Sequence, residues 1–284
     1  MAEIVAVTAL SHAPGLTGWL DRADPAEARR LLDGFADVGR RVRAARPDVI
    51  VGVANDHLLN FPLSNVPDFC IGTAERWRGP ADWFRDWLNV EPYEVPGHPD
   101  LARALVREGA RLGVNFAFSD ELQFDDNWSV PLKFLTPDHD VPLVPIHMNC
   151  IVPPLPAPER CLEVGRIIAR IVRERAPAGL RIAIMATGGL SHDPGGPKYF
   201  DVDEAFDRWF LDLIATAPPE RAAREATIER MVAAGDGGTT ELLSWLVALG
   251  AAEGRRCRTA CYEPSRALRC GMGAVVWEGE PAPA

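Results

Sequence analysis

Apolar residues along this chain form short continuous runs that alternate with longer amphipathic stretches, a pattern that predicts strands alternating with helices. Runs typical of strands buried on both faces of a sheet occur at 4–10, 48–56, 141–149 and 180–189. Stretches with apolar residues at helical spacing occur at 26–47, 98–113 and 158–177. We therefore expect an α/β fold.

The rest of the chain has weaker periodicity. The segment 61–98 is rich in Trp, Pro and Gly, so we expect an irregular excursion there, and a loop at 119–130. The last third is mostly helical in pattern up to about 253, followed by a polar loop and a strand at 270–279. Because no repeat and no Gly/Ser-rich linker divides it, we expect residues 1–284 to form a single catalytic domain.

The composition narrows the choice of partners. The chain has 284 residues, 47% of them hydrophobic, and a formal net charge of −10. A nucleic-acid or anionic-membrane surface would require clustered Lys and Arg, which the sequence lacks. No apolar run approaches the roughly 20 residues that span a bilayer, and MAEIVAVTAL is unlike a signal peptide. We expect a cytoplasmic protein that binds neither nucleic acid nor a membrane.

The six cysteines point to reduced thiols in the core, because a long cytoplasmic chain without a CxxC pair gives no framework for disulfides. Cys257 and Cys261 are four residues apart, but no second pair completes a zinc site.

Three histidines follow apolar strands directly: His12 in SHAPG, His57 in ANDH and His192 in GGLSHDPGG. We expect them at the carboxyl edge of one sheet, where open α/β folds build their sites. Glu241 follows GDGGTT and begins an apolar helix, in which a buried carboxylate needs a partner. Two imidazoles and one carboxylate, His12, His57 and Glu241, are the ligand set that holds non-haem Fe(II) on one face. His192 supplies a base beside it.

Each of these residues also has a simpler interpretation. His12 can cap a helix, and His57 can hydrogen-bond to backbone at its strand end; as a ligand, His57 would instead have Asn55 and Asp56 as acceptors that fix its tautomer. Glu241 is favoured by the helix dipole alone, and His192 can be a turn residue paired with Asp193.

Together, SHAPG, ANDH, GGLSHDPGG, GGTTELLSWLVALGA and YEPSRALRCGMGAVVW resemble, in order and spacing, the class III extradiol ring-cleavage dioxygenases. The type member of that family is the catalytic subunit of protocatechuate 4,5-dioxygenase. The resemblance implies an α/β fold with a central mixed sheet flanked by helices. It implies Fe(II) ligation by His12, His57 and Glu241, with His192 as the base. The expected reaction is extradiol opening of a catechol-type aromatic ring by O2.

One segment departs from the family pattern, which usually has Asp-His-Gly before a Val/Gln-Pro-Leu stretch. Here the segment is FDDNWSVPLKFL, and register on Pro131 and Leu132 puts Asp126 in place of that histidine and Asn127 in place of the glycine. We expect a catalytic role for Asp126. Substrate contacts are expected from three residues, which are Asn127, Trp128 and Pro194.

Because Asp126 stands where the family usually has a histidine, an aminophenol or hydroxypyridone ring remains an alternative substrate. The same triad could also hold zinc, for a hydrolase or a DOPA-type dioxygenase relative. A non-enzymatic Memo-like binding protein is the alternative from another class. By the resemblance the protein either forms homo-oligomers or needs a small accessory subunit. Sequence alone does not identify the ring substituents or distinguish proximal from distal cleavage.

Overall fold

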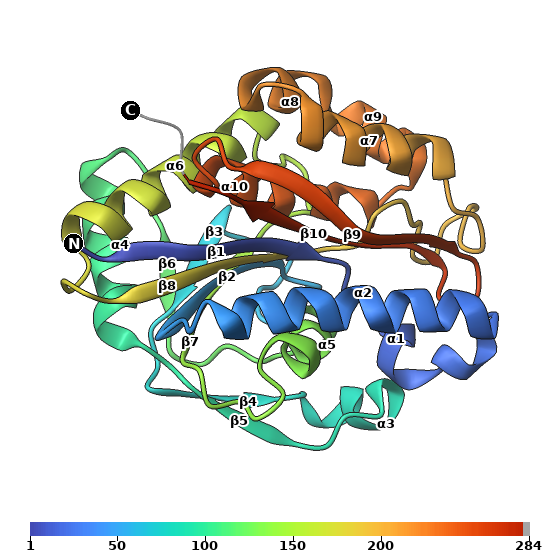
Figure 1. Ribbon diagram of the computed structural model, residues 1–284, viewed down its shortest axis with the longest axis horizontal. Helices are drawn as coiled ribbons and strands as arrows, with labels where there is room; N and C mark the ends of the chain where they lie inside the picture. Colours follow the sequence, from blue (N-terminus) through green and yellow to red (C-terminus); the bar gives the residue numbers. More distant parts are fainter. Residues whose placement is uncertain (281–284) are drawn as a thin grey trace.

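Short runs rich in Val, Ile and Ala form the central strands, because β-branched and small side chains fit a pleated surface that is covered on both faces. The computed structural model describes residues 1–280. An eight-stranded sheet with the order β6-β3-β7-β2-β8-β1-β10-β9 crosses it (Figure 1). Its strands are β1 (Glu3–Leu10), β2 (Val49–Asn55), β3 (Phe69–Gly72), β6 (Ala117–Ser119), β7 (Leu143–Met148), β8 (Arg181–Thr187), β9 (Arg256–Ser265) and β10 (Cys270–Glu278).

The sheet is mixed. Its four central strands run parallel, with β8 between β1 and β2, and β7 beyond β2. At one side β10 pairs antiparallel with β1, and β9 with β10; at the other β3 pairs antiparallel with β7. The predicted α/β fold with a mixed central sheet is confirmed, and the parallel strands bring their carboxyl ends to one edge.

Helices cover both faces of the sheet. The longest, α2 (Pro25–Ala44), begins at Asp24, whose side chain accepts hydrogen bonds from two backbone N–H groups of the first turn. The others include α4 (Pro99–Arg111), α5 (Asp126–Leu135), α6 (Pro158–Arg175), α7 (Glu204–Thr216), α8 (Pro219–Glu225), α9 (Ile228–Ala234) and α10 (Leu242–Ala251). Shorter elements are α1 (Gly15–Gly18), α3 (Arg85–Leu88), η1 (Leu20–Arg22), η2 (Asp82–Phe84), η3 (Thr239–Glu241) and a hairpin of β4 (Arg76–Gly79) and β5 (Tyr93–Pro96).

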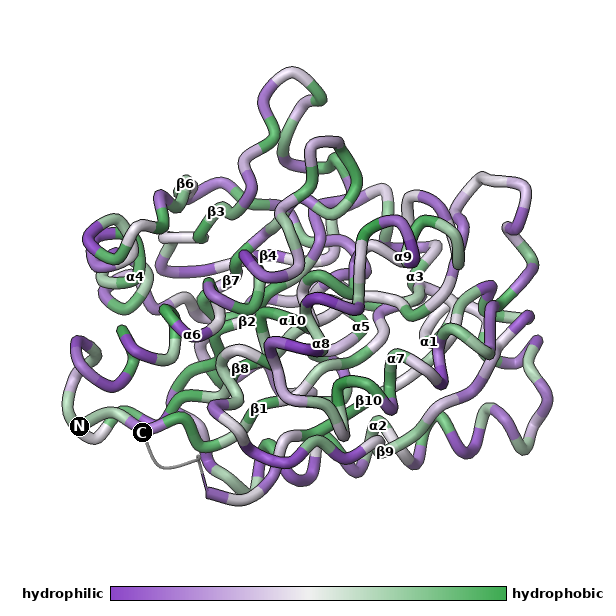
Figure 2. The backbone as a smooth tube through the Cα atoms, turned by 90° about the horizontal axis from the view of Figure 1, so that it is seen from above, coloured by the Kyte–Doolittle hydropathy of each residue, from purple (hydrophilic) through white to green (hydrophobic). Residues whose placement is uncertain are grey.

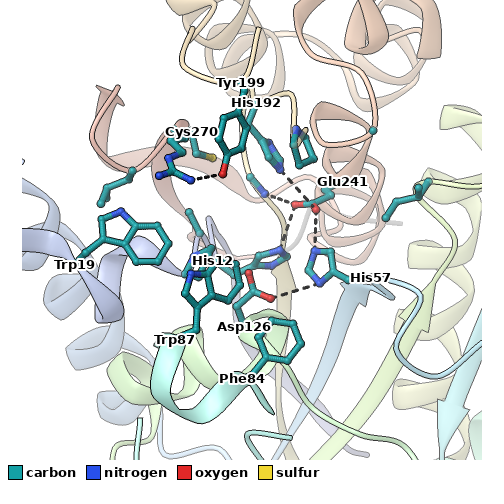
Figure 3. A pocket seen from close by; sticks show the side chains of 18 residues that line it. His12, Trp19, His57, Phe84, Trp87, Asp126, His192, Tyr199, Glu241 and Cys270 are labelled. Carbon is teal, nitrogen blue, oxygen red and sulfur yellow. Dashed lines mark hydrogen bonds and ion pairs between the residues drawn. The ribbon is translucent and has the colours of Figure 1, made fainter. Parts of the chain in front are cut away.

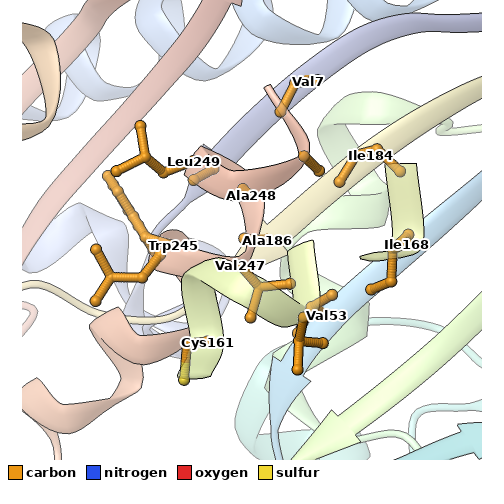
Figure 4. Close-up of a cluster of buried hydrophobic side chains, with 14 of the residues drawn as sticks. Val7, Val53, Cys161, Ile168, Ile184, Ala186, Trp245, Val247, Ala248 and Leu249 are labelled. Carbon is orange, nitrogen blue, oxygen red and sulfur yellow. The ribbon is translucent and has the colours of Figure 1, made fainter. Parts of the chain in front are cut away.

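Two hydrophobic clusters result, one on each face. One combines strand residues with α4, α6, α7 and α10, and the other combines them with α2, α5 and the β4–β5 hairpin. In Figure 2 the central strands are mainly hydrophobic, whereas polar and apolar residues alternate along α2. Figure 4 shows Val247 of α10 close to Val53 of the sheet. The two faces therefore bury the apolar runs that the sequence indicated.

Two glycines bring α6 and α10 close together. A Cβ on Gly165 would lie 1.9 Å from the carbonyl oxygen of Val247, and one on Gly250 would lie 2.1 Å from that of Leu162. The helix backbones thus approach to a distance that no larger residue permits at these positions. This contact fixes α10, whose N-cap residue is Glu241.

Three weakly patterned segments turned out to be structured. The predicted excursion at 61–98 contains β3 of the main sheet, and part of the loop predicted at 119–130 belongs to α5. The polar stretch before 270 is the edge strand β9, not a loop. These predictions were wrong because β3 is only four residues long, α5 contains Pro131, and an edge strand tolerates polar residues.

The six cysteines are free within the part of the chain that the structure describes, and five of them are buried. No helix among residues 1–280 is both long and apolar enough to cross a membrane.

Candidate metal centre and active site

The carboxyl ends of β1, β2 and β8 meet at one edge of the sheet. His12 follows β1, His57 follows β2, and the glycine-rich segment with His192 follows β8. The three histidines therefore come from neighbouring strands, as the order of strands in the sheet requires. Glu241 enters from the helical layer, at the end of η3 and the start of α10.

The carboxylate of Glu241 contacts both strand-end histidines (Figure 3). Its Oε2 lies 3.2 Å from Nε2 of His12, and its Oε1 lies 3.0 Å from Nε2 of His57. The backbone N–H of Gly189 donates to Oε2 at 2.7 Å, and the side-chain amide of Asn55 donates to Oε1 at 3.3 Å. Burial acts to raise the pKa of Glu241, but His12 and His192 hold it well below its usual range. Glu241 is thus an ionised carboxylate.

Oxygen atoms behind the two imidazoles fix their orientation. Nδ1 of His12 lies 2.7 Å from the hydroxyl of Thr187, and Nδ1 of His57 lies 3.1 Å from Oδ2 of Asp125. With the proton on Nδ1, each ring presents the lone pair of Nε2 toward Glu241. Asn55 and Asp56, expected to fix the tautomer of His57, do not do so. Asp125 takes that place.

Burial opposes protonation of His57. The adjacent carboxylates of Asp125 and Asp126, together with Glu241, nevertheless raise its pKa well above the usual range. A site that concentrates negative charge around imidazoles in this way is also suited to a cation.

The donor set fits a metal ion. Nε2 of His12 is buried and makes no hydrogen bond within the described residues, although Glu241 is close to it. Ligand atoms of His12, His57 and Asp126 also lie within 4.8 Å of one another, so Asp126 is a rival to Glu241. Asp126, however, is 3.5 Å from Nδ1 of His57, the nitrogen that faces away from Glu241. Only Glu241 faces Nε2 of both rings, so it completes the more coherent ligand set.

His192 lies beside this set without belonging to it. Its Nδ1–H donates to the carbonyl oxygen of Leu190 at 2.8 Å, while its Nε2 lies 3.7 Å from Oε1 of Glu241. Burial lowers the pKa of His192, but Cys270 and Glu241 beside it raise it well above the usual range. A cation bound to Glu241 offsets that carboxylate, and leaves Nε2 able to accept a proton.

Glycines make room for the ring of His192. A Cβ on Gly189 would lie 2.6 Å from its Cε1, and one on Gly238 would lie 2.6 Å from its Nε2. The glycine pairs of GGLSHDPGG and GDGGTT thus serve close packing around the imidazole.

Hydrogen bonds to α7 also anchor the segment that carries His192. Asp207 of α7 accepts hydrogen bonds from the backbone N–H of Ser191 at 2.7 Å and from its hydroxyl at 2.9 Å. The hydroxyl of Tyr262 on β9 donates to the same carboxyl at 2.9 Å. Burial raises the pKa of Asp207 to about 6, against the effect of these donors. Asp193 does not pair with the His192 ring; it accepts from the backbone of Lys198.

A cavity of about 320 Å³ opens over the histidines and Glu241. Its walls are mostly apolar, with Trp19, Phe84 and Trp87 on one side of the ligand set in Figure 3. Asp126, His192 and Pro194 line it, as the sequence predicted, and Arg269 lines it as well. A cavity of this size, apolar with a few polar groups, is typical of a small-ligand site.

Asn127 and Trp128 do not line the cavity. The amide of Asn127 donates to the carbonyl oxygen of Asn55 at 2.9 Å, and the indole of Trp128 donates to Nε2 of His147 at 2.8 Å. Both residues are fully buried. We therefore revise their expected role from substrate contact to support of the sheet: Asn127 holds β2, which leads to His57, and Trp128 holds β7.

Sequence reasoning missed two charged groups, Asp125 behind His57 and Arg269 on the cavity wall. Asp125 was read as part of a loop, although as the residue before α5, with its side chain accepting from the N–H of Asn127, it shows the usual pattern of a helix cap. Arg269 lies within the motif YEPSRALRCGMGAVVW, which gives no sign of its contacts. Burial raises the pKa of Asp126 to about 6, with Asp125 and Glu241 adding to the rise and His57 opposing it.

Residues 6–269 match the family described as the catalytic LigB subunit of aromatic ring-opening dioxygenase. The chain is similar to 2,3-dihydroxyphenylpropionate/2,3-dihydroxicinnamic acid 1,2-dioxygenase 2 of Pseudomonas putida, with 32% identity over 80% of this chain and 68% of the relative. The corresponding Rhodococcus enzyme is 31% identical over 81% of this chain and 69% of the relative. The chain thus spans about two thirds of the length of these relatives.

A crystal structure of an uncharacterized protein from Escherichia coli K12 has a similar fold. Its TM-score is 0.58 at 20% identity, over 87% of this chain and 92% of that one. This likeness bears on the fold alone.

Proposed function

Because this chain belongs to the family of catalytic LigB subunits of aromatic ring-opening dioxygenases, we propose that it uses Fe(II) and O2 to open a catechol-type ring outside its diol. The relatives' names specify 2,3-dihydroxyphenyl compounds, which are ortho-diols. Two adjacent oxygens can bind one metal ion together. The observation that carries the proposal is the convergence of His12, His57 and Glu241 on the wall of an apolar cavity.

His12, His57 and Glu241 would hold the iron. Bound there, Fe(II) would supply Lewis acidity toward the diol and electron density toward O2. The protein residues do the rest. Thr187 and Asp125 keep each Nε2 directed at the site, and Gly189 fixes one oxygen of Glu241. Phe84 and Trp87 provide flat apolar surfaces for an aromatic ring and limit the access of water.

His192 acts as the general base of this proposal. Its Nδ1–H is held by the carbonyl oxygen of Leu190, so Nε2 is the nitrogen directed at the cavity, and a cation bound to Glu241 would leave it able to accept a proton. From that position Nε2 accepts a hydroxyl proton of the bound diol. The hydrogen bonds from Ser191 to Asp207 keep the segment in place during this transfer.

An aminophenol is the second candidate substrate, and Asp126 is the observation that favours it. The carboxyl group of Asp126 lines the cavity close to His57 and can accept a hydrogen bond from a ring amino group. The same metal site would then open a ring with one hydroxyl and one amino group.

An anaerobic metal exchange tests both candidates and the zinc alternative. Protein loaded with Fe(II) or with Zn(II) is mixed with catechol, a substituted catechol or 2-aminophenol, and O2 is then admitted. We expect the Fe(II) protein to consume one O2 per ring and to give the ring-opened chromophore, and the Zn(II) protein to consume none. No O2 uptake by the Fe(II) protein with any of these rings would overturn the proposal.

The oligomeric state belongs to the proposal as well, either as a homo-oligomer or with a small accessory subunit. Trp83 and Phe200 are 67% and 61% exposed and offer apolar surface for such contacts. Light scattering on the purified chain, alone and with candidate subunits, decides between the two.

A further inference from the structure

Arg269 is the single Lys or Arg side chain among the residues that line the cavity. It lies in the turn between β9 and β10, directly before Cys270. Its φ is +61°, a left-handed conformation that glycine or asparagine adopts at lower cost. An arginine at such a position calls for a role of its side chain.

Aromatic rings surround the guanidinium of Arg269. Its Cζ lies 4.6 Å from the ring centroid of Tyr199, 5.3 Å from that of Phe200 and 5.7 Å from that of Trp19. Rings at these distances stabilise the cation and restrict where its N–H groups point. The guanidinium is therefore held in place on the cavity wall.

Most of the donors of this guanidinium have no partner among residues 1–280. One N–H group donates to the hydroxyl of Tyr199. No carboxylate within residues 1–280 pairs with Arg269, whereas Arg258, on the same hairpin, pairs with both Asp37 and Glu278. A positive fork with free donors, next to apolar walls, is suited to bind a carboxylate through two parallel hydrogen bonds.

The position of Arg269 relative to His12, His57 and Glu241 indicates which end of a bound ring would face the guanidinium. The following residue, Cys270, packs beside Gly189 and His192. In Figure 3, Cys270 and Tyr199 lie on the His192 side of the site, away from Asp126 and Phe84. A ring whose diol faces His12, His57 and Glu241 would thus have a negative residue at one end and the free guanidinium near the other.

We propose that Arg269 anchors a carboxylate carried on a side chain of the ring, so that the enzyme selects catechols with an acidic side chain. This proposal rests on the function proposed above. The carboxylate accepts N–H bonds from the guanidinium, while Trp19 and Leu268 contact the apolar linker between carboxylate and ring. The side chain then fixes how the diol is turned toward the metal site.

A pair of probes with the same ring and a three-carbon side chain, one ending in a carboxylate and the other in a methyl group, tests this inference. With Fe(II)-loaded protein we compare 2,3-dihydroxyphenylpropionate with 3-propylcatechol, by kcat/KM and by calorimetric Kd without O2. We expect the acid to be favoured in both measurements by about ten- to a hundredfold, the usual size of a charged hydrogen-bond pair. In Arg269→Gln the two probes should have nearly equal kcat/KM and Kd values, and the change should come mainly from KM and Kd. Arg269→Lys should retain part of the preference for the acid.

Arg266→Gln is the matched control, because Arg266 belongs to the same turn but is exposed and lies outside the cavity lining. It should leave the preference unchanged. If Arg269→Gln weakens both probes equally, Arg269 acts only by holding Tyr199, and the inference is overturned. Opening of both rings with equal efficiency by the unmodified protein also overturns it, and leaves the proposed function intact. Opening of neither ring would instead count against the proposed function.

Discussion

Nε2 of His57 lies 3.0 Å from Oε1 of Glu241, although the two residues are 184 positions apart in the chain. The contact joins the end of β2 to the start of α10, and thereby links the sheet to one of its covering layers. Glu241 is 1% exposed. An ionised carboxylate at that depth is costly unless positive charge accompanies it, and this supports the proposal that Glu241 and the histidines hold a metal ion.

Removal of either partner of this contact should release the metal. We expect Glu241→Ala and His57→Ala to lose most of the Fe(II) that the unmodified protein binds at one ion per chain, while both remain folded. Metal analysis after anaerobic loading and gel filtration measures the loss, and circular dichroism monitors folding. Full iron occupancy in both variants would refute the assignment.

Asp126→Asn decides between the two carboxylates near the histidines. Because Asp126 faces Nδ1 and not Nε2 of His57, this variant should keep its iron. If Asp126→Asn loses iron while Glu241→Gln retains it, the ligand set is His12, His57 and Asp126 instead.

His192→Ala should separate the chemical step from metal binding. The ring lies 3.7 Å from Glu241 and is held by a backbone carbonyl, so its loss should leave iron occupancy unchanged. Turnover should fall by about 10² to 10⁴, the usual range for a positioned general base. Single-turnover rates with an anaerobically preloaded ring measure this effect. An unchanged rate would assign the base to another group.

The sequence predicted the strand-end histidines because a regular pattern carries that information. Continuous apolar runs locate β1, β2 and β8, and parallel strands must bring His12, His57 and His192 to one edge. Glu241 could be assigned because it begins an apolar helix, where a buried carboxylate needs a partner. These inferences need only local sequence and sheet geometry.

The groups that orient the ligands could not be found in the same way. Asp125 reaches His57 across 68 positions, and Thr187 reaches His12 across 175. No periodicity relates such residues, since their contact depends on how α5 and β8 pack. Arg269 was missed for the same reason: its cage of Trp19, Tyr199 and Phe200 comes from separate segments.

Gly165→Ala tests the close contact between α6 and α10. The added methyl group would lie 1.9 Å from the carbonyl oxygen of Val247, which is backbone and cannot rotate away. We expect a loss of about 3 kcal/mol or more in the free energy of unfolding, measured with urea. Gly113→Ala, which meets open space at φ +85°, should cost only about 1 kcal/mol. Equal losses would show that the helices separate at little cost.

Asp207 should make stability depend on pH. Burial raises its pKa to about 6 from an ordinary value of 3.8, so between these values the folded protein binds a proton that the unfolded chain has released. This proton contributes fully to the free energy of unfolding below about pH 4. The contribution, about 2 to 3 kcal/mol, is lost as the pH rises through 6. Unfolding free energies at pH 4.5 and 7.5 should therefore differ less in Asp207→Asn than in the unmodified protein. A difference of the same size in both would exclude this carboxyl as the cause.

Asp126→His should change which rings the enzyme accepts. Asp126 lines the cavity beside His57, where the family resemblance leads one to expect a histidine. A carboxylate there repels an acid group attached directly to the ring, whereas an imidazole can donate a hydrogen bond to it. We therefore expect the unmodified protein to use protocatechuate poorly compared with catechol, and the variant to raise the ratio of the two kcat/KM values by about tenfold or more.

The pair Asp126→His and Arg269→Gln separates the two ends of the cavity. Asp126→His should leave the preference for a distant carboxylate in place, because that group faces Arg269, and Arg269→Gln should leave the protocatechuate ratio in place. In the double variant the two changes should add, since groups on opposite walls with no shared partner act independently. The kcat/KM values of catechol, protocatechuate, 3-propylcatechol and 2,3-dihydroxyphenylpropionate for the four proteins give the complete comparison. If Asp126→His alters none of these ratios, Asp126 does not face the ring, and the register of FDDNWSVPL with the family pattern is wrong.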